Sequence, residues 1–339
     1  MTSNISDEDL LRHASRVSGQ VIIITGGASG IGRAAVLEFA KRGAKIVIGD
    51  INTEASGELV NAIRISGGTA IWRTCNVLDY EDQRSLFEFA LEEFGSIDVV
   101  IANAGVRETE KLVGSEVQLD ERGLPVEPKL MTVQMNFISV IYTAQLAFYY
   151  LSKATNENSL KTLILIASIL SFATLNAPLY CSSKHAVFSL MQSLKPEFER
   201  SGFRIASVHP WFTDTPIISE SVRNVLYGIP LSPMYRVAGA VVLAVTDTLP
   251  GTNGAAYTIP DEREVFRIMP GKLNEGVLGL LAKRAKRVNG PSYPLITIYA
   301  LARCCAGGKR VKLAAWATLG YTLWKLSLTV LFYSRKLSL

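Results

Sequence analysis

Short apolar runs rich in β-branched residues recur along the first 210 residues, with stretches of helical periodicity between them. A run that is apolar throughout suits a strand buried on both faces. Alternation of such strands with helices is typical of βαβ units. The pattern therefore predicts an α/β fold, a doubly wound parallel sheet with helices on both faces. The predicted strands are 21–25, 45–50, 69–77, 98–105, 160–168 and 203–210.

The chain is expected to form one main domain over residues 18–265, because no repeat or low-complexity linker interrupts it. Residues 1–17 are polar and are predicted to be an N-terminal tail. A shift in composition predicts a helical C-terminal extension over 270–339. Residues 106–130 are charged, carry two prolines and make an unusually long connection, which predicts a lid or a partner surface.

Composition narrows the class of protein. The four cysteines show neither disulfide-framework nor zinc-site spacing, and the N-terminus lacks the apolar segment of a signal peptide. We therefore expect a cytoplasmic protein with no metal site. The net charge of +5 comes largely from the last seventy or so residues, where basic clusters alternate with apolar runs. This interleaving favours a membrane surface over nucleic acid.

A glycine-rich turn follows the first predicted strand and opens an amphipathic stretch. Glycines at such a turn let backbone amides approach a pyrophosphate at the positive end of the next helix. The alternative is a tight turn that binds no ligand. The strand, turn and helix context favours a dinucleotide site, whose candidate residues here are Gly26, Ser29, Gly30, Ile31 and Gly32.

The second predicted strand ends in Asp50, 18 residues after Gly32. A carboxylate there can accept hydrogen bonds from the adenosine ribose, and its charge repels the extra phosphate of NADP. NAD is therefore predicted over NADP. Two other readings stay open: Asp50 only caps the next segment, or nearby cations attract a phosphate. The cations are Arg33, Lys41 and Arg42.

Small and amide residues end the third and fourth predicted strands, at the edge where an open parallel sheet binds ligands. Asn76 and Val77 are expected beside the adenine, and Asn103 with Ala104 and Gly105 beside the cofactor's sugar. Each of these short stretches, taken alone, also fits an ordinary loop.

Tyr180 and Lys184 lie four residues apart on a predicted helix, so their side chains share one face. A free phenol is a poor base at neutral pH, and a nearby ammonium group together with a positive nicotinamide ring favours the phenolate. We therefore expect a lowered pKa for Tyr180. Ser168, at the end of the fifth predicted strand, can hydrogen-bond a substrate oxygen.

Taken together, these residues resemble the classical short-chain dehydrogenase/reductase family over roughly residues 18–262. The resemblance implies a seven-stranded sheet, Tyr180 as general acid/base and cofactor contact, Lys184 as its electrostatic partner and nicotinamide-ribose ligand, and Ser168 as oxyanion donor. It also implies that Asn136 completes a catalytic tetrad by holding a water beside the lysine. Within the family the chain looks most like fungal enzymes grouped with 15-hydroxyprostaglandin dehydrogenase.

One stretch departs from the family pattern. Where the family usually has Pro-Gly after its sixth strand, this chain has His209, Pro210 and Trp211. Thr213 and Thr215, which the resemblance implies meet the nicotinamide carboxamide, keep their register. The bulk of Trp211 leaves the shape of the substrate pocket open.

The extension contains two segments with membrane character. Residues 313–333 have spanning length but contain Lys325, and residues 276–287 are basic. A central lysine disfavours a full span, whereas a helix in the headgroup layer lets Lys325 reach water. Three interpretations stay open: a span, a surface contact through 276–339, or a helix packed on the enzyme or its dimer.

The sequence thus predicts an NAD-dependent oxidoreductase that moves hydride between the cofactor and a lipophilic secondary alcohol or ketone, in fungal secondary metabolism, as a homodimer or homotetramer. Two alternatives are a catalytically silent dinucleotide-binding protein and a redox-neutral isomerase or dehydratase on the same fold.

Overall fold

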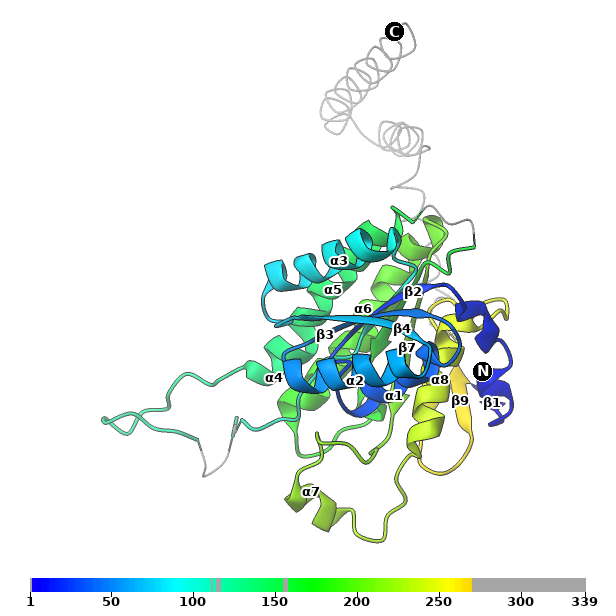
Figure 1. Cartoon of the computed structure of the whole chain (residues 1–339). Coiled ribbons are helices and arrows are strands. Elements are labelled where there is room, and N and C mark those ends of the chain that lie inside the picture. The colour runs from blue at the N-terminus through cyan, green and yellow to red at the C-terminus, as the bar shows by residue number, and fades with distance from the viewer. Residues whose placement is uncertain (1, 111, 114–116, 155–157, 270–339) are drawn as a thin grey trace, which may run out of the picture. The chain divides into compact units, whose positions relative to one another are not determined.

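Within the described residues, nine strands form one sheet with helices packed against it (Figure 1). The computed structural model describes residues 2–110, 112–113, 117–154 and 158–269. All of these lie in one compact unit that extends to Pro270. The strands are β1 (Thr2–Ile5), β2 (Val21–Thr25), β3 (Lys45–Asp50), β4 (Thr69–Thr74), β5 (Val99–Ala102), β6 (Thr162–Ile166), β7 (Arg204–Pro210), β8 (Ala256–Ile259) and β9 (Val265–Ile268).

The strand order is β1-β9-β8-β7-β6-β5-β2-β3-β4. The seven strands from β8 to β4 are parallel, and the order reverses between β2 and β5. A doubly wound sheet binds ligands at the carboxyl ends of its strands where the order reverses. The predicted fold class is confirmed, and each of the six predicted strands is present.

Helices cover both faces of the sheet. Because both faces are buried, the strands are apolar throughout: Ile22 and Ile24 of β2 face one helical layer, and Val21 and Ile23 face the other. Helices α1, α2 and α8 contribute to the first core, and α3, α5 and α6 to the second. The helices are α1 (Gly30–Ala40), α2 (Thr53–Ile65), α3 (Tyr80–Phe94), α4 (Met131–Val133), α5 (Ser139–Leu151), α6 (Pro178–Arg200), α7 (Glu220–Val225) and α8 (Met234–Thr246).

The structure differs from the predicted tail over residues 1–17, because residues 2–17 pack on the domain. β1 pairs antiparallel with β9, and two short 3₁₀ turns follow at Asp9–Leu11 and Ala14–Val17. Leu10, Ala14 and Val17 are buried in the first core. Polar residues separate these apolar positions, so the average composition of the segment did not predict that it packs on the domain. Strands β1 and β9 also raise the expected seven strands to nine.

The long connection expected at 106–130 reaches away from the domain body, and we call it the arm (Figure 1). Its outer part folds back as a hairpin with a bridge between Leu119 and Pro125. The Asp120 carboxylate closes the turn by accepting the backbone N–H groups of Arg122 and Leu124.

The predicted extension over 270–339 lies outside the described residues, and so do its segments 276–287 and 313–333. Within the described part of the chain, no helix has both the length and the hydropathy needed to cross a bilayer. Membrane contact through 276–339 and a cytoplasmic location therefore stay predictions.

A buried ion pair ties β9 to the end of α8. Arg267 donates to Asp247 across 2.6 Å, and both side chains are more than nine-tenths buried. The Tyr257 hydroxyl donates to the same carboxylate at 2.7 Å. Removing one partner of such a pair leaves an uncompensated buried charge, so this cluster should resist substitution.

Asp247→Ala should therefore lower the free energy of unfolding by about 3–5 kcal/mol, as measured by urea titration. Asp261→Ala is the matched control, because it removes a carboxylate from the exposed pair with Arg263. The control should leave the urea midpoint close to that of the wild type. Equal midpoints for the two variants would contradict the role assigned to the buried pair.

Candidate active site

The glycine-rich turn packs against its own backbone. Gly26 and Gly30 have positive φ angles of 64° and 51°. A Cβ at Gly32 would lie 2.1 Å from the Gly26 carbonyl oxygen, and a Cβ at Gly26 would lie 2.8 Å from Ala104 Cα. These positions need glycine for the fold of the turn itself, which sets the N-terminus of α1 at the strand ends. Ser29 caps that helix with an extended backbone and is exposed, while Ile31 is half-buried.

Asn103 fastens the end of β5 to the end of β2. Its side-chain amide donates to the carbonyls of Thr25 at 3.0 Å and Gly26 at 2.8 Å. The Thr25 hydroxyl accepts the backbone N–H groups of Asn103 and Ala104. The structure thus gives the Asn103 amide a role within the turn, whereas the sequence suggested a cofactor contact.

The Asp50 carboxylate is fixed beside the glycine turn. One oxygen accepts the Ala28 N–H at 2.9 Å and the other accepts the Asn52 N–H at 3.0 Å. This geometry holds a negative charge at the end of β3, next to the glycine turn. The side chain of Asn76, the next strand-end candidate, is exposed and bonds the Leu78 N–H, while Val77 is buried in the core.

The four predicted tetrad residues meet at this edge of the sheet. The Tyr180 phenol hydrogen-bonds Ser168. Lys184 Nζ donates to the Ile166 carbonyl at 3.1 Å and lies 5.6 Å from the centroid of the Tyr180 ring.

Gly105 lies close to the side chains of Asn136 and Lys184. A Cβ at Gly105 would lie 2.9 Å from Asn136 Oδ1 and 3.8 Å from Lys184 Nζ, so only a glycine lets them approach from both sides.

Asn136 lies on a single turn of π-helix, Gln134–Ile138, between α4 and α5. Such turns are frequent at functional sites because they redirect a side chain. Its amide is fully buried and bonds both backbone groups of Val106, accepting the N–H at 2.8 Å and donating to the carbonyl at 2.9 Å. The turn therefore aims Asn136 at the start of the arm.

Burial shifts both ionisable members of the tetrad away from their charged forms. It raises the pKa of Tyr180 to about 12, although the hydrogen bond with Ser168 acts in the opposite direction. It lowers the pKa of Lys184 to about 8. The lowered phenol pKa expected from sequence includes the charge of a nicotinamide ring and stays a prediction, whereas in the protein itself the loss of hydration is the largest influence and raises the pKa. At neutral pH, Tyr180 is a proton donor and Lys184 is still mostly charged.

His209 is a site residue whose role was missed from sequence. It is fully buried, with Nδ1 at 2.9 Å from the Ser168 carbonyl and Nε2 at 2.7 Å from the Ser207 hydroxyl. A carbonyl can only accept, so Nδ1 carries the proton and the serine donates to Nε2. The ring also packs against Phe172 and Phe188. His209 thereby fixes the backbone of Ser168.

The two threonines predicted to contact the nicotinamide end are both buried. The Thr213 hydroxyl donates to the Trp211 carbonyl at 3.1 Å. The Thr215 hydroxyl has no hydrogen-bond partner among the described residues, and the Cβ and methyl group of Thr215 lie next to Gly30 at the start of α1. Buried hydroxyls are normally paired. An unpaired donor beside a helix N-terminus suits a polar group of a bound dinucleotide, so these residues fit that cofactor.

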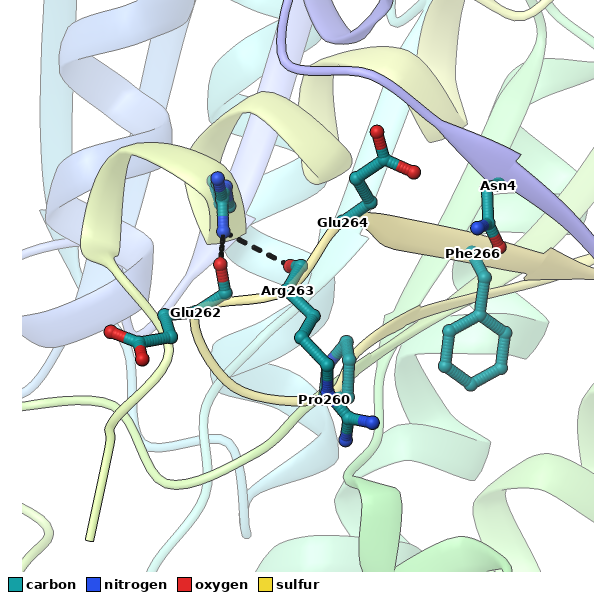
Figure 2. Close-up of a pocket in the computed structure, with 7 residues that line it drawn as sticks. Asn4, Pro260, Glu262, Arg263, Glu264 and Phe266 are labelled. Carbon is teal, nitrogen blue, oxygen red and sulfur yellow. Dashed lines mark hydrogen bonds between the residues drawn. The ribbon is translucent and has the colours of Figure 1, made fainter.

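A surface hollow of about 480 Å³ lies between β1 and the β8–β9 turn (Figure 2). Its guanidinium groups are already engaged: Arg236 pairs with Asp7 and bonds the carbonyls of Glu262 and Arg263, and Arg263 pairs with Asp261. This hollow therefore offers no unpaired guanidinium to a ligand. In the described part of the chain, no cluster of three His, Cys, Asp or Glu side chains suits a metal ion.

The fold and the site define a dinucleotide-dependent enzyme of the Rossmann class. The family model described as short chain dehydrogenase matches residues 20–225, which include the glycine turn and the tetrad. The chain belongs to the short-chain dehydrogenase family and is an oxidoreductase.

Several named relatives cover most of the described domain. Cyclohexanol dehydrogenase from Acinetobacter sp. (strain SE19) is 28% identical over 252 residues, which cover 73% of this chain and 95% of the relative. Short-chain dehydrogenase/reductase prx4 from Penicillium roqueforti is 32% identical over 255 residues, covering 74% and 71%. The NAD⁺ 15-hydroxyprostaglandin dehydrogenase of Bos taurus is 28% identical over 278 residues, covering 74% and 94%.

The crystal structure of gox2181 has a similar fold, with a TM-score of 0.62 and 20% sequence identity over 73% of this chain and 96% of that one. This likeness supports the fold alone.

The buried His209 predicts a distinct dependence of stability on pH. Burial lowers its pKa to about 3, whereas a histidine in the unfolded chain titrates near 6.5. Between these values the unfolded state binds more protons, so stability falls as pH falls. The loss from this residue should be about 2 kcal/mol between pH ~6.5 and ~4.5.

His209→Gln keeps a donor for Ser168 but cannot titrate, so its urea midpoint should vary less over that pH range. His185→Gln, which changes a partly exposed histidine on α6, is the control and should keep the wild-type slope. An unchanged slope in His209→Gln would show that the decline comes from other groups.

Proposed function

We propose that the protein is an NAD-dependent dehydrogenase that interconverts a lipophilic secondary alcohol and its ketone, with Tyr180 as the proton-transfer group. The observation that carries this proposal is the hydrogen-bonded pair of Tyr180 and Ser168, with Lys184 one helical turn beyond the phenol. The pair stands at the sheet edge that also bears the glycine turn.

The chain's own groups divide the chemistry between them. Bound NAD supplies the hydride acceptor for oxidation, and its reduced form supplies the hydride for reduction. Ser168 donates a hydrogen bond to the substrate oxygen and holds it near the Tyr180 phenol. In ketone reduction Tyr180 gives its proton to that oxygen, and in alcohol oxidation the phenolate takes the proton back. The Lys184 ammonium stabilises the phenolate.

Asp50 supports the choice of NAD. Its carboxylate is held at the turn by the Ala28 and Asn52 amides, so it cannot swing away from an adenosine ribose bound there. A phosphate on that ribose would meet a fixed negative charge. The NAD⁺ 15-hydroxyprostaglandin dehydrogenase relative is named for the same cofactor.

Exposed apolar side chains on the segments that flank the site support a lipophilic substrate. The arm begins directly after Gly105, and the α7 segment follows Thr215. A stable monomer rarely exposes many large apolar side chains in one region of its surface, so a concentration of them marks a binding region. The exposed residues are Leu112, Val113, Leu119, Leu124, Val126, Phe172, Leu175, Ile217, Val225, Tyr227 and Ile229.

The two alternatives from sequence remain distinct hypotheses. A silent dinucleotide-binding protein has no need for a complete tetrad, and all four residues are present and close. A redox-neutral isomerase would use the same groups but would give product with no net change in NADH. A place in fungal secondary metabolism stays a prediction.

We also propose that the protein forms a homodimer or homotetramer. An apolar hollow of about 270 Å³ lies between α5 and α6, lined by residues such as Ile141, Phe148 and Leu194. A second copy of the chain, offering the same surface, is the occupant we infer. Light scattering after size exclusion measures the mass, and a monomer would exclude this assembly.

Tyr180→Phe should lower kcat by on the order of 10³-fold or more, because the phenol is the group assigned to exchange a proton with the substrate oxygen. The Kd for NADH, measured by fluorescence titration, should stay within about threefold, since the other residues assigned to the cofactor are unchanged. The assay follows NADH absorbance with a panel of secondary alcohols and ketones. Wild-type turnover in this variant would remove Tyr180 from the mechanism.

Asp50→Asn should shift preference from NAD toward NADP by at least about 10-fold in kcat/KM, because a repulsive charge of a few kcal/mol is removed. The amide oxygen can still accept the Ala28 N–H, so the turn is preserved. Steady-state assays with both cofactors give the ratio. A ratio equal to that of the wild type would show that Asp50 serves the turn alone.

A further inference from the structure

Helix α6, which carries Tyr180 and Lys184, begins without a capping side chain. Its N-cap residue is Ala177, which has no side-chain acceptor, and Pro178 at the first helical position has no N–H. The first N–H satisfied within the helix is that of Cys181, which donates to the Ala177 carbonyl at 2.9 Å. The N–H groups before it need acceptors from outside the helix.

Glu108 of the arm supplies the missing acceptor. Its Oε2 accepts the backbone N–H of Tyr180 at 2.7 Å, from a position 72 residues earlier in the chain. Tyr180 is the third residue of the helix, the position that an N-cap side chain would normally serve. A carboxylate at the positive end of a helix dipole makes a stronger hydrogen bond than a neutral acceptor.

The same short segment holds a second member of the tetrad. Val106, two residues before Glu108, uses both of its backbone groups to bond the Asn136 side chain. Residues 106–108 therefore connect the π-helical turn that bears Asn136 to the first turn of α6. Beyond this segment, Glu110 accepts the backbone N–H and the hydroxyl of Thr132, which fastens the arm to α4 and not to the catalytic helix.

We propose that Glu108 is a positioning residue for catalysis: it replaces the absent N-cap of α6 and thereby fixes the backbone of Tyr180 relative to Ser168 and Asn136. This inference rests on the proposed role of Tyr180 as the proton-transfer group. The first turn of an uncapped helix frays, and a displaced phenol loses its alignment with the substrate oxygen.

Glu108→Ala should lower kcat by on the order of 10-fold or more, while the Kd for NADH and the thermal midpoint stay close to the wild type. Glu108→Gln keeps an acceptor oxygen for the Tyr180 N–H and should recover most of the activity. The matched control is Glu110→Ala, which removes the other anchor of the arm and should leave kcat within about threefold. Comparable losses in Glu108→Ala and Glu110→Ala would overturn the proposal in favour of general fastening of the arm.

A rescue in the helix itself separates capping from other effects of the carboxylate. Ala177→Asp places an acceptor at the N-cap of α6, so adding it to Glu108→Ala should restore kcat at least in part. A double variant as slow as Glu108→Ala, with a wild-type thermal midpoint, would overturn the capping role.

Hydrogen exchange tests the inference without turnover. The Tyr180 amide should exchange faster in Glu108→Ala and at the wild-type rate in Glu110→Ala, whether or not a substrate has been found. If wild-type protein shows no turnover while the exchange result holds, the proposed function fails and the anchoring stands. Unchanged exchange in Glu108→Ala would remove the anchoring even if Tyr180 proves catalytic.

Discussion

The site depends on the contact between the ends of β2 and β5, where the strand order reverses. The sheet supplies two parallel strands in register there, and Asn103 then joins them by donating to the last carbonyls of β2. The approach is so close that a Cβ at Gly26 would collide with the backbone at Ala104. This contact sets where α1 begins and where the arm leaves the sheet. The groups assigned to the cofactor and to proton transfer lie at the same sheet edge as this junction.

Near that junction, the fold buries ionisable side chains of the candidate active site. Tyr180, Lys184 and His209 all have pKa values shifted toward their neutral forms, and burial is the main cause in each case. For His209 the result is a permanent neutral ring that orients Ser168. Tyr180 and Lys184 are also buried, so water does not stabilise their charged forms. A charged or polar group that binds next to them can supply that stabilisation, and their charge state therefore depends on the bound ligand.

The sequence predicted the parallel sheet and six of its strands from apolar runs, and it placed Tyr180 and Lys184 on one helix face from their spacing. Asn136 and the role of each tetrad residue came from the family resemblance. It did not predict that Asn103 serves the turn or that Glu108 caps α6, since such hydrogen bonds join residues far apart in the chain. One local pattern did indicate that α6 needs an external cap: Ala177 precedes Pro178, so the helix begins without an N-cap side chain that can accept a hydrogen bond. The raised pKa of Tyr180 was missed because burial cannot be judged from residue spacing.

The pairing of β1 with β9 has a consequence for how the chain folds during synthesis. Thr2 lies opposite Ile268, so the first strand gains its partner only after nearly all of the domain has left the ribosome. The intervening strands and helices can assemble earlier, because their contacts join segments closer in sequence. Residues 2–5 must therefore stay unpaired for most of translation, and they join the sheet as its final edge.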